Sequence, residues 1–242
     1  MLLLLLNLIC ALLFAHGQPD QTMVRMVYPF GSPFDEILVN GPFDVSLNQI
    51  SEDNGTRIEI EAPNHLHQQI VSEIIDNHTL SVYTVGSFHS HRNILVRIVF
   101  KAPLLRYGIK GTGNTITEND GITNKDGEKF VLANHGTANV AMQLDVYELN
   151  ALLTGTGNTR LWGKVREKST ISSKGVGDVN AVNLTSKRVV VQASGVGNVG
   201  VSGIEDAQIK VTGVSTVYYR LPDGKVPSVA LTTGLGEILS LP

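Results

Sequence analysis

The chain has little of what several classes of protein require. Its 242 residues include a single cysteine, Cys10, and only 17% are charged. The 19 basic residues are outnumbered by 22 acidic ones, so no positive excess is available to neutralise nucleic-acid phosphates. An apolar content of 42% is too high for a disordered chain of this length. The composition therefore predicts an ordered protein with no nucleic-acid partner.

The first fifteen residues contain no charged side chain at all. This apolar run is too short for a bilayer span, which needs about 20 residues, and it ends in Ala15-His16-Gly17, with small residues where a signal peptidase cleaves. We therefore expect a signal peptide at residues 1–17 and a secreted mature chain without a membrane span. A membrane anchor or a buried N-terminal helix is the alternative. Cleavage would remove Cys10 and, with it, every disulfide, thiolate metal site and cysteine nucleophile.

Three triplets match the acceptor pattern for N-glycosylation, and their asparagines are Asn54, Asn77 and Asn183. In a secretory pathway that glycosylates proteins, these residues would carry glycans and lie at the surface. Chance occurrence in a chain rich in Asn and Thr is the alternative interpretation.

Glycine, in contrast, is abundant, and many of the 24 glycines belong to a repeated motif, Gly-x-Gly-Asn/Asp or a weaker copy of it. The spacings between copies are 25, 19, 20, 20, 18 and 21 residues, and the first glycines are Gly111, Gly136, Gly155, Gly175, Gly195, Gly213 and Gly234. Such regular self-similarity is typical of repeat architectures.

Apolar and polar residues alternate on both sides of each motif, as Val191 and Ala193 before Gly195 and Val199 after it illustrate. A period of two on both sides predicts a strand, a glycine corner and a second strand, with one face inward. Glycine suits the corner because it adopts a positive φ without steric cost. In the copies where another residue replaces the second glycine, a left-handed conformation would cost about 1 kcal/mol, or the corner has a different shape; these residues are Ala138 and Ser215.

Units of this kind bury their apolar faces only by stacking. The predicted fold is therefore all-β, a right-handed parallel β-helix (β-solenoid) with repeats of about 20 residues. The polar residue after each corner would then form a hydrogen-bonded column of Asn114, Asn139, Asn158, Asp178 and Asn198. An antiparallel meander sandwich is the competing geometry, although it does not require identical corners at constant intervals.

We expect one domain over residues 24–242. Residues 106–242 would form the repeated coils, and residues 24–105 would form irregular opening coils and an N-terminal cap, because an uncapped end leaves a strand edge free to pair. Gly41-Pro42-Phe43-Asp44-Val45 is interpreted as an early, distorted corner. Residues 67–75 would form one or two helical turns, or a strand.

The order of these segments resembles the putative auto-transporter adhesin head (GIN) domain family. The similarity extends from Phe43-Asp44-Val45 through the strands Ile58-Glu59-Ile60 and Val96-Arg97-Ile98-Val99-Phe100 to the series of glycine corners, over about residues 30–242. The resemblance implies a right-handed, pectin-lyase-like β-helix and a surface or secreted role in adhesion. It supplies no catalytic residues.

No cluster of catalytic residues is visible in the sequence. The acidic residues of the repeats occupy different positions within them: Asp145, Glu148, Glu167, Asp178, Glu205 and Asp206. The pairs His65/His67 and His89/His91 would each place two rings on one side of a strand, but a metal site needs further ligands, and surface histidines are the simpler interpretation. We therefore expect no catalytic residue, no cofactor and no metal site.

The alternation places Trp162 and Tyr218 outward and Leu161 and Tyr219 inward. The expected function is that of a secreted, non-enzymatic β-solenoid with adhesin-like binding of a cell surface, a glycan or a protein. One alternative is a carbohydrate-active enzyme, which two carboxylates about 5–10 Å apart in a groove would favour. Another is a structural protein that self-assembles through its solenoid ends into a homo-oligomer.

Overall fold

Strands form most of the structure. The computed structural model describes residues 22–51, 55–86, 90, 92–101 and 103–242. The N-terminal strands are β1 (Met23–Pro29), β2 (Glu36–Asn40), β3 (Phe43–Gln49), β4 (Arg57–Pro63), β5 (Ile70–Ile75), β6 (Thr79–Thr84) and β7 (Ile94–Phe100). They are followed by β8 (Arg106–Ile109), β9 (Thr112–Thr117), β10 (Ile122–Thr123), β11 (Lys129–Asn134), β12 (Thr137–Leu153), β13 (Thr159–Ser173), β14 (Val179–Ala193), β15 (Val199–Val211), β16 (Val217–Arg220), β17 (Val229–Thr232) and β18 (Ile238–Ser240). The predicted all-β class is confirmed.

The described residues contain only two short 3-10 helices, η1 (Asn64–Gln69) and η2 (Pro222–Gly224). Neither has the length or apolar character needed to cross a bilayer. The predicted signal peptide at residues 1–17, with Cys10, lies outside the described residues.

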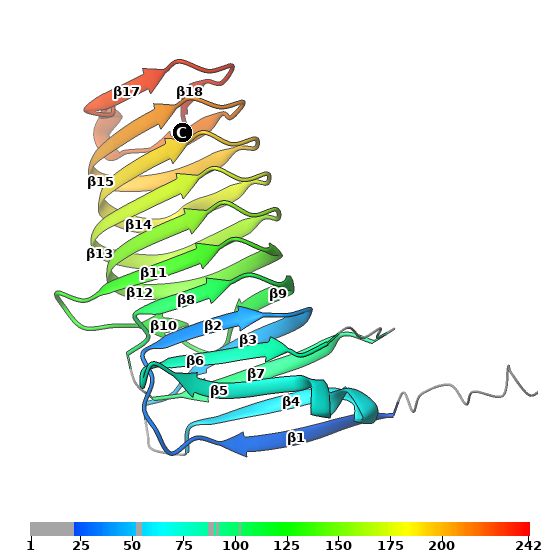
Figure 1. Cartoon of the computed structure of the whole chain (residues 1–242). Helices are drawn as coiled ribbons and strands as arrows, with labels where there is room; N and C mark the ends of the chain where they lie inside the picture. Colours follow the sequence, from blue (N-terminus) through cyan, green and yellow to red (C-terminus); the bar gives the residue numbers. More distant parts are fainter. Residues whose placement is uncertain (1–21, 52–54, 87–89, 91, 102) are drawn as a thin grey trace, which may run out of the picture.

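Successive strands pair in parallel, and each partner lies about one sequence repeat further along the chain. Val140 of β12 lies opposite Thr159 of β13, which lies opposite Val179 of β14. Val179 in turn lies opposite Val199 of β15, so the offsets are 19, 20 and 20 residues. Figure 1 shows the result as a stack of similar layers, from green to orange. This parallel order excludes the antiparallel meander sandwich for β12–β15.

The alternation of side chains along these strands separates a core from an outer face. Leu161 is 1% and Tyr219 9% exposed, whereas Trp162 and Tyr218 are only half-buried, as the sequence predicts. The long strands bend at register irregularities, such as the one between Val146 and Glu148 in β12, so each strand contributes to two sides of its layer. The largest fully buried side chains are Tyr107, Phe43, Phe100 and Phe130.

The first glycine of each corner is required by close contact with the layer before it. A Cβ on Gly195 would lie 2.1 Å from the carbonyl oxygen of Gly175, and one on Gly175 would lie 1.9 Å from that of Gly155. The same close contact is found at the first corner, where a Cβ on Gly111 would lie 1.9 Å from the carbonyl oxygen of Gly41. Positive φ, the reason given above why glycine suits the corner, does not apply to these first glycines, because their φ angles are not in the left-handed region.

Positive φ is found instead at the second glycine of four corners, at Gly113, Gly157, Gly177 (+141°) and Gly197 (+132°), but not at Gly236. Ala138 and Ser215, which stand at this position in two other copies, do not have positive φ. The corner therefore has a different shape in those copies, which was one of the two predicted alternatives.

The N-terminal strands are not stacked in chain order. Strand β2 pairs in parallel with β6 and β8, and β3 pairs in parallel with β7 and β9. The β2–β3 layer therefore lies between the β6–β7 layer and the β8–β9 layer (Figure 1). At the bottom of the stack, β4 pairs antiparallel with β1 and β7, and β5 pairs antiparallel with β6. Residues 67–75 contain both predicted alternatives, because η1 ends at Gln69 and β5 begins at Ile70.

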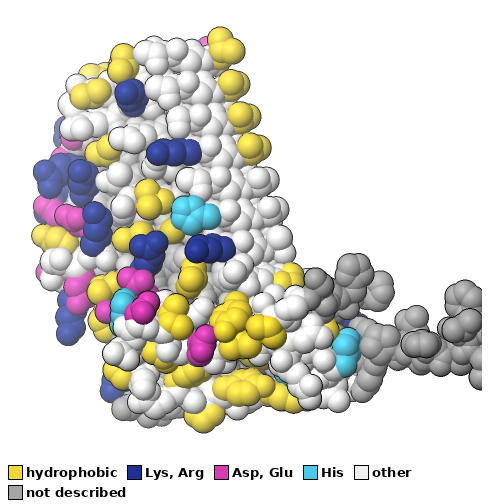
Figure 2. All heavy atoms as spheres, viewed as in Figure 1, with side chains coloured by type: hydrophobic (Ala, Val, Ile, Leu, Met, Phe, Trp, Pro, Cys, Tyr) yellow, Lys and Arg dark blue, Asp and Glu magenta, His cyan; other side chains and the backbone are white. Residues whose placement is uncertain are grey.

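Exposed apolar side chains line the corner of the later layers. Val176, Val196 and Val214 are 50–55% exposed and stack through isolated parallel bridges, and Leu235 is 87% exposed. Figure 2 shows a row of hydrophobic side chains along one edge of the molecule. At the same position, the earlier layers carry Thr112, Thr137 and Thr156.

Candidate binding groove

The polar residues that follow the corners form the predicted column. Asn139 Oδ1 accepts a hydrogen bond from the backbone N–H of Asn158 at 2.9 Å, and Asn158 Oδ1 accepts one from Asp178 at 2.9 Å. Asp178 Oδ1 in turn accepts the backbone N–H of Asn198 at 2.7 Å. Because each side chain bonds to the next layer, the column links layers through bonds additional to the strand ladders.

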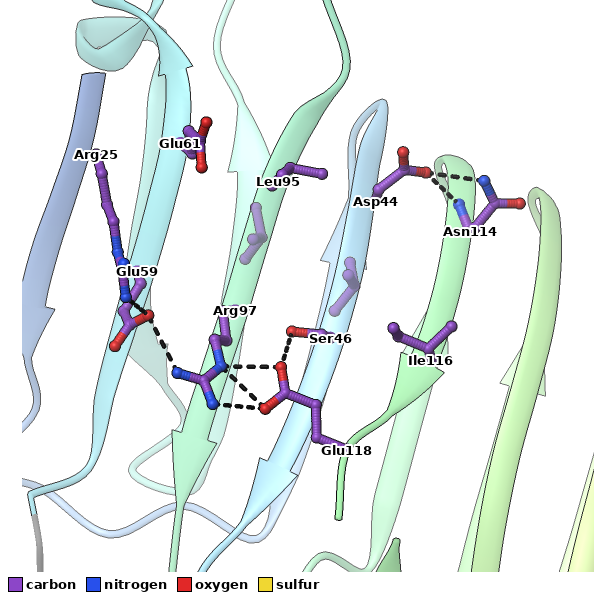
Figure 3. A pocket seen from close by; sticks show the side chains of 12 residues that line it. Arg25, Asp44, Ser46, Glu59, Glu61, Leu95, Arg97, Asn114, Ile116 and Glu118 are labelled. Atoms are coloured by element: carbon purple, nitrogen blue, oxygen red, sulfur yellow. Dashed lines mark hydrogen bonds and ion pairs between the residues drawn. The ribbon is translucent and has the colours of Figure 1, made fainter. Parts of the chain in front are cut away.

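The column begins one layer earlier than the sequence analysis placed it. Asp44 Oδ1 accepts hydrogen bonds from the backbone N–H of Asn114 at 2.8 Å and from its side-chain amide at 3.0 Å (Figure 3). We call this set the amide column: Asp44, Asn114, Asn139, Asn158, Asp178 and Asn198.

A groove runs beside the amide column on the outer face of the sheet. The outward residues two positions after the column members lie opposite one another from strand to strand and form its floor, together with Arg97, which lies opposite Ser46: these residues are Ser46, Ile116, Ala141 and Arg160. Two hollows of about 550 and 490 Å³ share Asn114 and Ile116 among their lining residues. They therefore adjoin at these two residues, and together they form a groove that extends across β7, β3, β9, β12 and β13.

One end of the groove contains a network of ion pairs (Figure 3). The carboxylate of Glu59 is only 6% exposed and is bound by Arg25 and by Arg57, the latter at 2.8 Å. Arg97 lies 3.4 Å from Glu59 and, on its other side, 2.5 Å from Glu118. These side chains meet because β4 pairs with both β1 and β7.

Both carboxylates of the network are held in their ionised form. Burial by itself would raise the pKa of Glu59, but the hydrogen bonds and charges of Arg57 and Arg25 outweigh it and lower the pKa below its ordinary value. The hydrogen bond from Arg97 is the largest cause that lowers the pKa of Glu118, and a 2.8 Å bond from Ser46 adds to it.

At the other end of the groove, Arg160, which lines it, lies against the single tryptophan, Trp162. The guanidinium carbon of Arg160 lies 5.7 Å from the ring centroid of Trp162, within the range of a cation–π contact. Trp162 Nε1 donates a hydrogen bond to Gln143 Oε1 at 3.2 Å, which fixes the ring against the neighbouring strand. Tyr218 lies further along the same face, opposite Gly200.

The ion-pair end of the groove was not predicted from the sequence. Glu59 and Arg97 each stand between two apolar residues, and this alternation predicts that each side chain lies on the outer face of a strand. Their contact depends on the antiparallel β4–β7 pairing, and no local pattern reveals that pairing.

The other acidic residues that the sequence singled out do not gather into a site. Asp145 is paired with Arg166, Glu167 with Lys187 and Arg188, and Asp206 with Ser228. Across the described ranges, no three His, Cys, Asp or Glu side chains lie close enough together to hold a metal ion.

The predicted arrangement of His65 and His67 on one side of a strand is wrong. Both lie on η1, where the local 3-10 geometry replaces the strand alternation. His67 is buried, and its Nε2 lies 2.8 Å from the carbonyl oxygen of Val24 on β1. This contact gives it a structural role, because it ties η1 to the edge strand. His89 and His91 lie outside the described residues.

Two of the three candidate glycosylation sites lie at the described surface. Asn77 is exposed in the turn between β5 and β6, with a φ of +61°, and Asn183 is exposed on β14. Asn54 lies outside the described residues. Glycosylation of these residues stays a prediction.

Comparisons with known proteins point to one family. A family model described as "Putative auto-transporter adhesin, head GIN domain" matches residues 33–220. The structure of a putative adhesin from Bacteroides fragilis is 25% identical and superposes with a TM-score of 0.82, covering 93% of this chain and 99% of that one. A putative adhesin from Parabacteroides distasonis is 19% identical, with a TM-score of 0.66 and coverages of 92% and 98%, and shows a similar fold. No curated protein matches the chain.

Proposed function

The chain belongs to the putative auto-transporter adhesin family with a head GIN domain, and from this premise we propose that it is a non-enzymatic, adhesin-like protein that binds its target through the groove beside the amide column. The observation that carries the proposal is the extent of this groove. Its two adjoining hollows are lined by ion pairs at one end, by exposed Ile116 where they meet, and by the amides of the column and Arg160 at the other end. A long, shallow and chemically mixed surface of this kind suits an extended ligand.

The rival function, a carbohydrate-active enzyme, has one observation in its favour. Glu59 and Glu118 both contact Arg97 and line the same groove, so two carboxylates do come together. A glycosidase, however, needs one of its two carboxylic acids protonated, with a raised pKa, to protonate the leaving group. Arginines lower the pKa of both glutamates, and the guanidinium of Arg97 separates them. This arrangement favours binding over catalysis.

We also propose a specific fold type and a secreted location for the chain. The stacked layers would form a right-handed parallel β-helix, and the parallel registers of 19–20 residues support this. Secretion through a signal peptide at residues 1–17 is part of the same proposal, because an adhesin acts at the cell surface or outside the cell.

A variant that fills the groove tests the proposal. Ala141 lies on the floor between Ile116 and Arg160, so Ala141→Arg would place a long side chain in the path of a ligand. Gln192→Arg introduces the same side chain and the same added charge at an exposed position of β14 outside the groove. The purified full chain and both variants would be applied to a printed array of glycans and extracellular-matrix proteins.

We expect the wild type and Gln192→Arg to bind the same spots, and Ala141→Arg to lose at least about tenfold in affinity. Thermal melts of all three proteins control for folding. Absence of binding to every spot, or equal binding by the wild type and a folded Ala141→Arg, would overturn the proposal.

A further inference from the structure

The amide column has spare hydrogen-bond donors facing the groove. Each Asn amide carries two N–H groups, of which the column uses at most one. Asn139 Nδ2, for example, donates to Asn114 Oδ1 at 3.1 Å. The oxygens, in contrast, already accept bonds from the next layer. The wall of the groove therefore offers a ligand a row of neutral donors.

The spacing of this row is fixed by the sheet. Neighbouring strands lie about 4.8 Å apart, so the six members of the column extend over about 24 Å in a direction across the strands. A ligand that bonds to this row of donors must be extended and must present hydrogen-bond acceptors at a similar spacing. An extended chain of pyranose sugars advances by a comparable distance per residue and carries hydroxyl oxygens along its whole length.

The charges in the groove do not favour a polyanion. Arg97 is bound by Glu59 and Glu118, so its charge is already compensated. The column itself contains the carboxylates of Asp44 and Asp178, which would repel a run of negative charges on a ligand. An uncharged ligand avoids both the repulsion and the cost of breaking the ion pairs.

A peptide strand has no backbone to pair with in this groove. Peptides that add to sheets do so at a free edge, whereas β3, β9, β12 and β13 each have hydrogen-bonded neighbours on both sides. Only side chains are available. At the far end, Arg160 lines the groove and Trp162 lies against it, so an aromatic surface stands beside guanidinium donors, a combination that suits the C–H and O–H groups of a sugar.

We propose that the groove binds an uncharged polysaccharide in an extended conformation, which lies across β3, β9, β12 and β13, accepts hydrogen bonds from the amide column and contacts Trp162. This inference rests on the proposed function, since it names the ligand class of the same groove. It assigns the specificity to the donors of Asn114, Asn139 and Asn158.

Affinity electrophoresis of the full chain in gels that contain a polysaccharide tests the inference. The neutral probes are a β-glucan, a xylan and a mannan, and the acidic probe is polygalacturonate. Asn139→Asp keeps the oxygen that accepts from Asn158 but removes the amide donors, and Asp44 and Asp178 already occupy equivalent positions. Trp162→Ala removes the aromatic contact. Tyr83→Ala, on β6 outside the groove, is the matched control for loss of an aromatic ring.

We expect at least one neutral polysaccharide to retard the protein equally at about 0.05 and 0.5 M salt, because the contacts involve no net charge. Asn139→Asp and Trp162→Ala should each weaken binding about tenfold, and Tyr83→Ala should bind as the wild type does. Retardation by polygalacturonate alone, lost at high salt, would overturn the ligand class, and so would the absence of retardation in all three neutral gels.

Normal retardation of folded Asn139→Asp and Trp162→Ala in a neutral gel would overturn the assignment of the site. Failure of the inference is distinguishable from failure of the proposed function. If the array shows binding that Ala141→Arg abolishes while the neutral gels show none, the groove is a binding site for a different class of ligand.

Discussion

The Cα of Gly195 faces the carbonyl oxygen of Gly175 so closely that a Cβ would lie only 2.1 Å from it. That oxygen belongs to the backbone and cannot move aside without separating two layers. The constraint repeats in every corner, so the column of first glycines sets how closely the layers stack.

Replacement of Gly195 by alanine should therefore destabilise the protein by about 3 kcal/mol or more, because the backbones of two layers must separate. Gly31→Ala is the matched control, since a Cβ at that position has no heavy atom within 4 Å, and it should stay within about 0.5 kcal/mol of the wild type. Chemical denaturation measures both values. Equal stability of the two variants would contradict the close contact.

The second prediction concerns the side-chain oxygen of Asp178 in the amide column. Asp178 Oδ1 accepts the backbone N–H of Asn198 at 2.7 Å. Asp178→Asn keeps an oxygen at this position, whereas Asp178→Ala removes it and leaves that N–H to the solvent. We expect a loss of about 1 kcal/mol for alanine and little change for asparagine, as measured by urea denaturation. A larger loss for asparagine than for alanine would show that the column does not act through its oxygen.

Glu59 should make the stability of the protein depend on acidic pH. The pKa of Glu59 in the folded protein lies below its ordinary value of 4.5, so the unfolded chain binds the proton more tightly. The stabilisation is fully present above about pH 4.5 and is lost as the pH falls through the lower, folded value. Stability should therefore fall on acidification in this range.

Glu59→Gln should lower the stability at neutral pH by on the order of 1–2 kcal/mol, a moderate loss because the arginine partners reach the solvent. It should also flatten the decline between about pH 5 and pH 3. Glu61→Gln, two residues along β4 on the same groove, is the matched control and should follow the wild-type curve. Thermal melts across this range give the measurement, and parallel curves for the wild type and Glu59→Gln would contradict the role of Glu59.

The sequence is sufficient to predict the features of the fold that repeat. The period of the corners and the column through Asn158 follow from the spacing of the glycine motif. The inward position of Leu161 and the outward position of Trp162 follow from local alternation, because each layer imposes the same environment on equivalent residues. The role of the first glycines was not predictable in the same way. Gly195 is required by the layer beneath it rather than by its own φ.

The ion-pair end of the groove was not predictable, because it depends on the order of the strands in space. Glu59 reaches Arg97 only because β4 turns back antiparallel to β7, and Asp44 meets Asn114 only because β3 lies against β9. These partners are 38 and 70 residues apart in the chain. Neither pairing follows the period of about twenty residues that identifies the other layers.

The exposed row of valines provides the last prediction, which compares two valines of a single layer. Val196 is 50% exposed at the corner, while Val199, three residues later, is fully buried. Threonine has nearly the shape of valine, and at the half-exposed position of Val196 its hydroxyl would stay in contact with water. Val196→Thr should therefore change the stability by less than about 0.5 kcal/mol.

Val199→Thr buries a hydroxyl between apolar side chains and should cost about 1–3 kcal/mol. Because the two substitutions are chemically identical, the difference between their denaturation midpoints reports burial alone. A Val196→Thr variant as unstable as Val199→Thr would show that the row of valines at the corner is covered in solution, for example by a second copy of the chain. The concentration dependence of the melting temperature would then identify that contact, since a melt of a self-associated protein shifts upward with concentration.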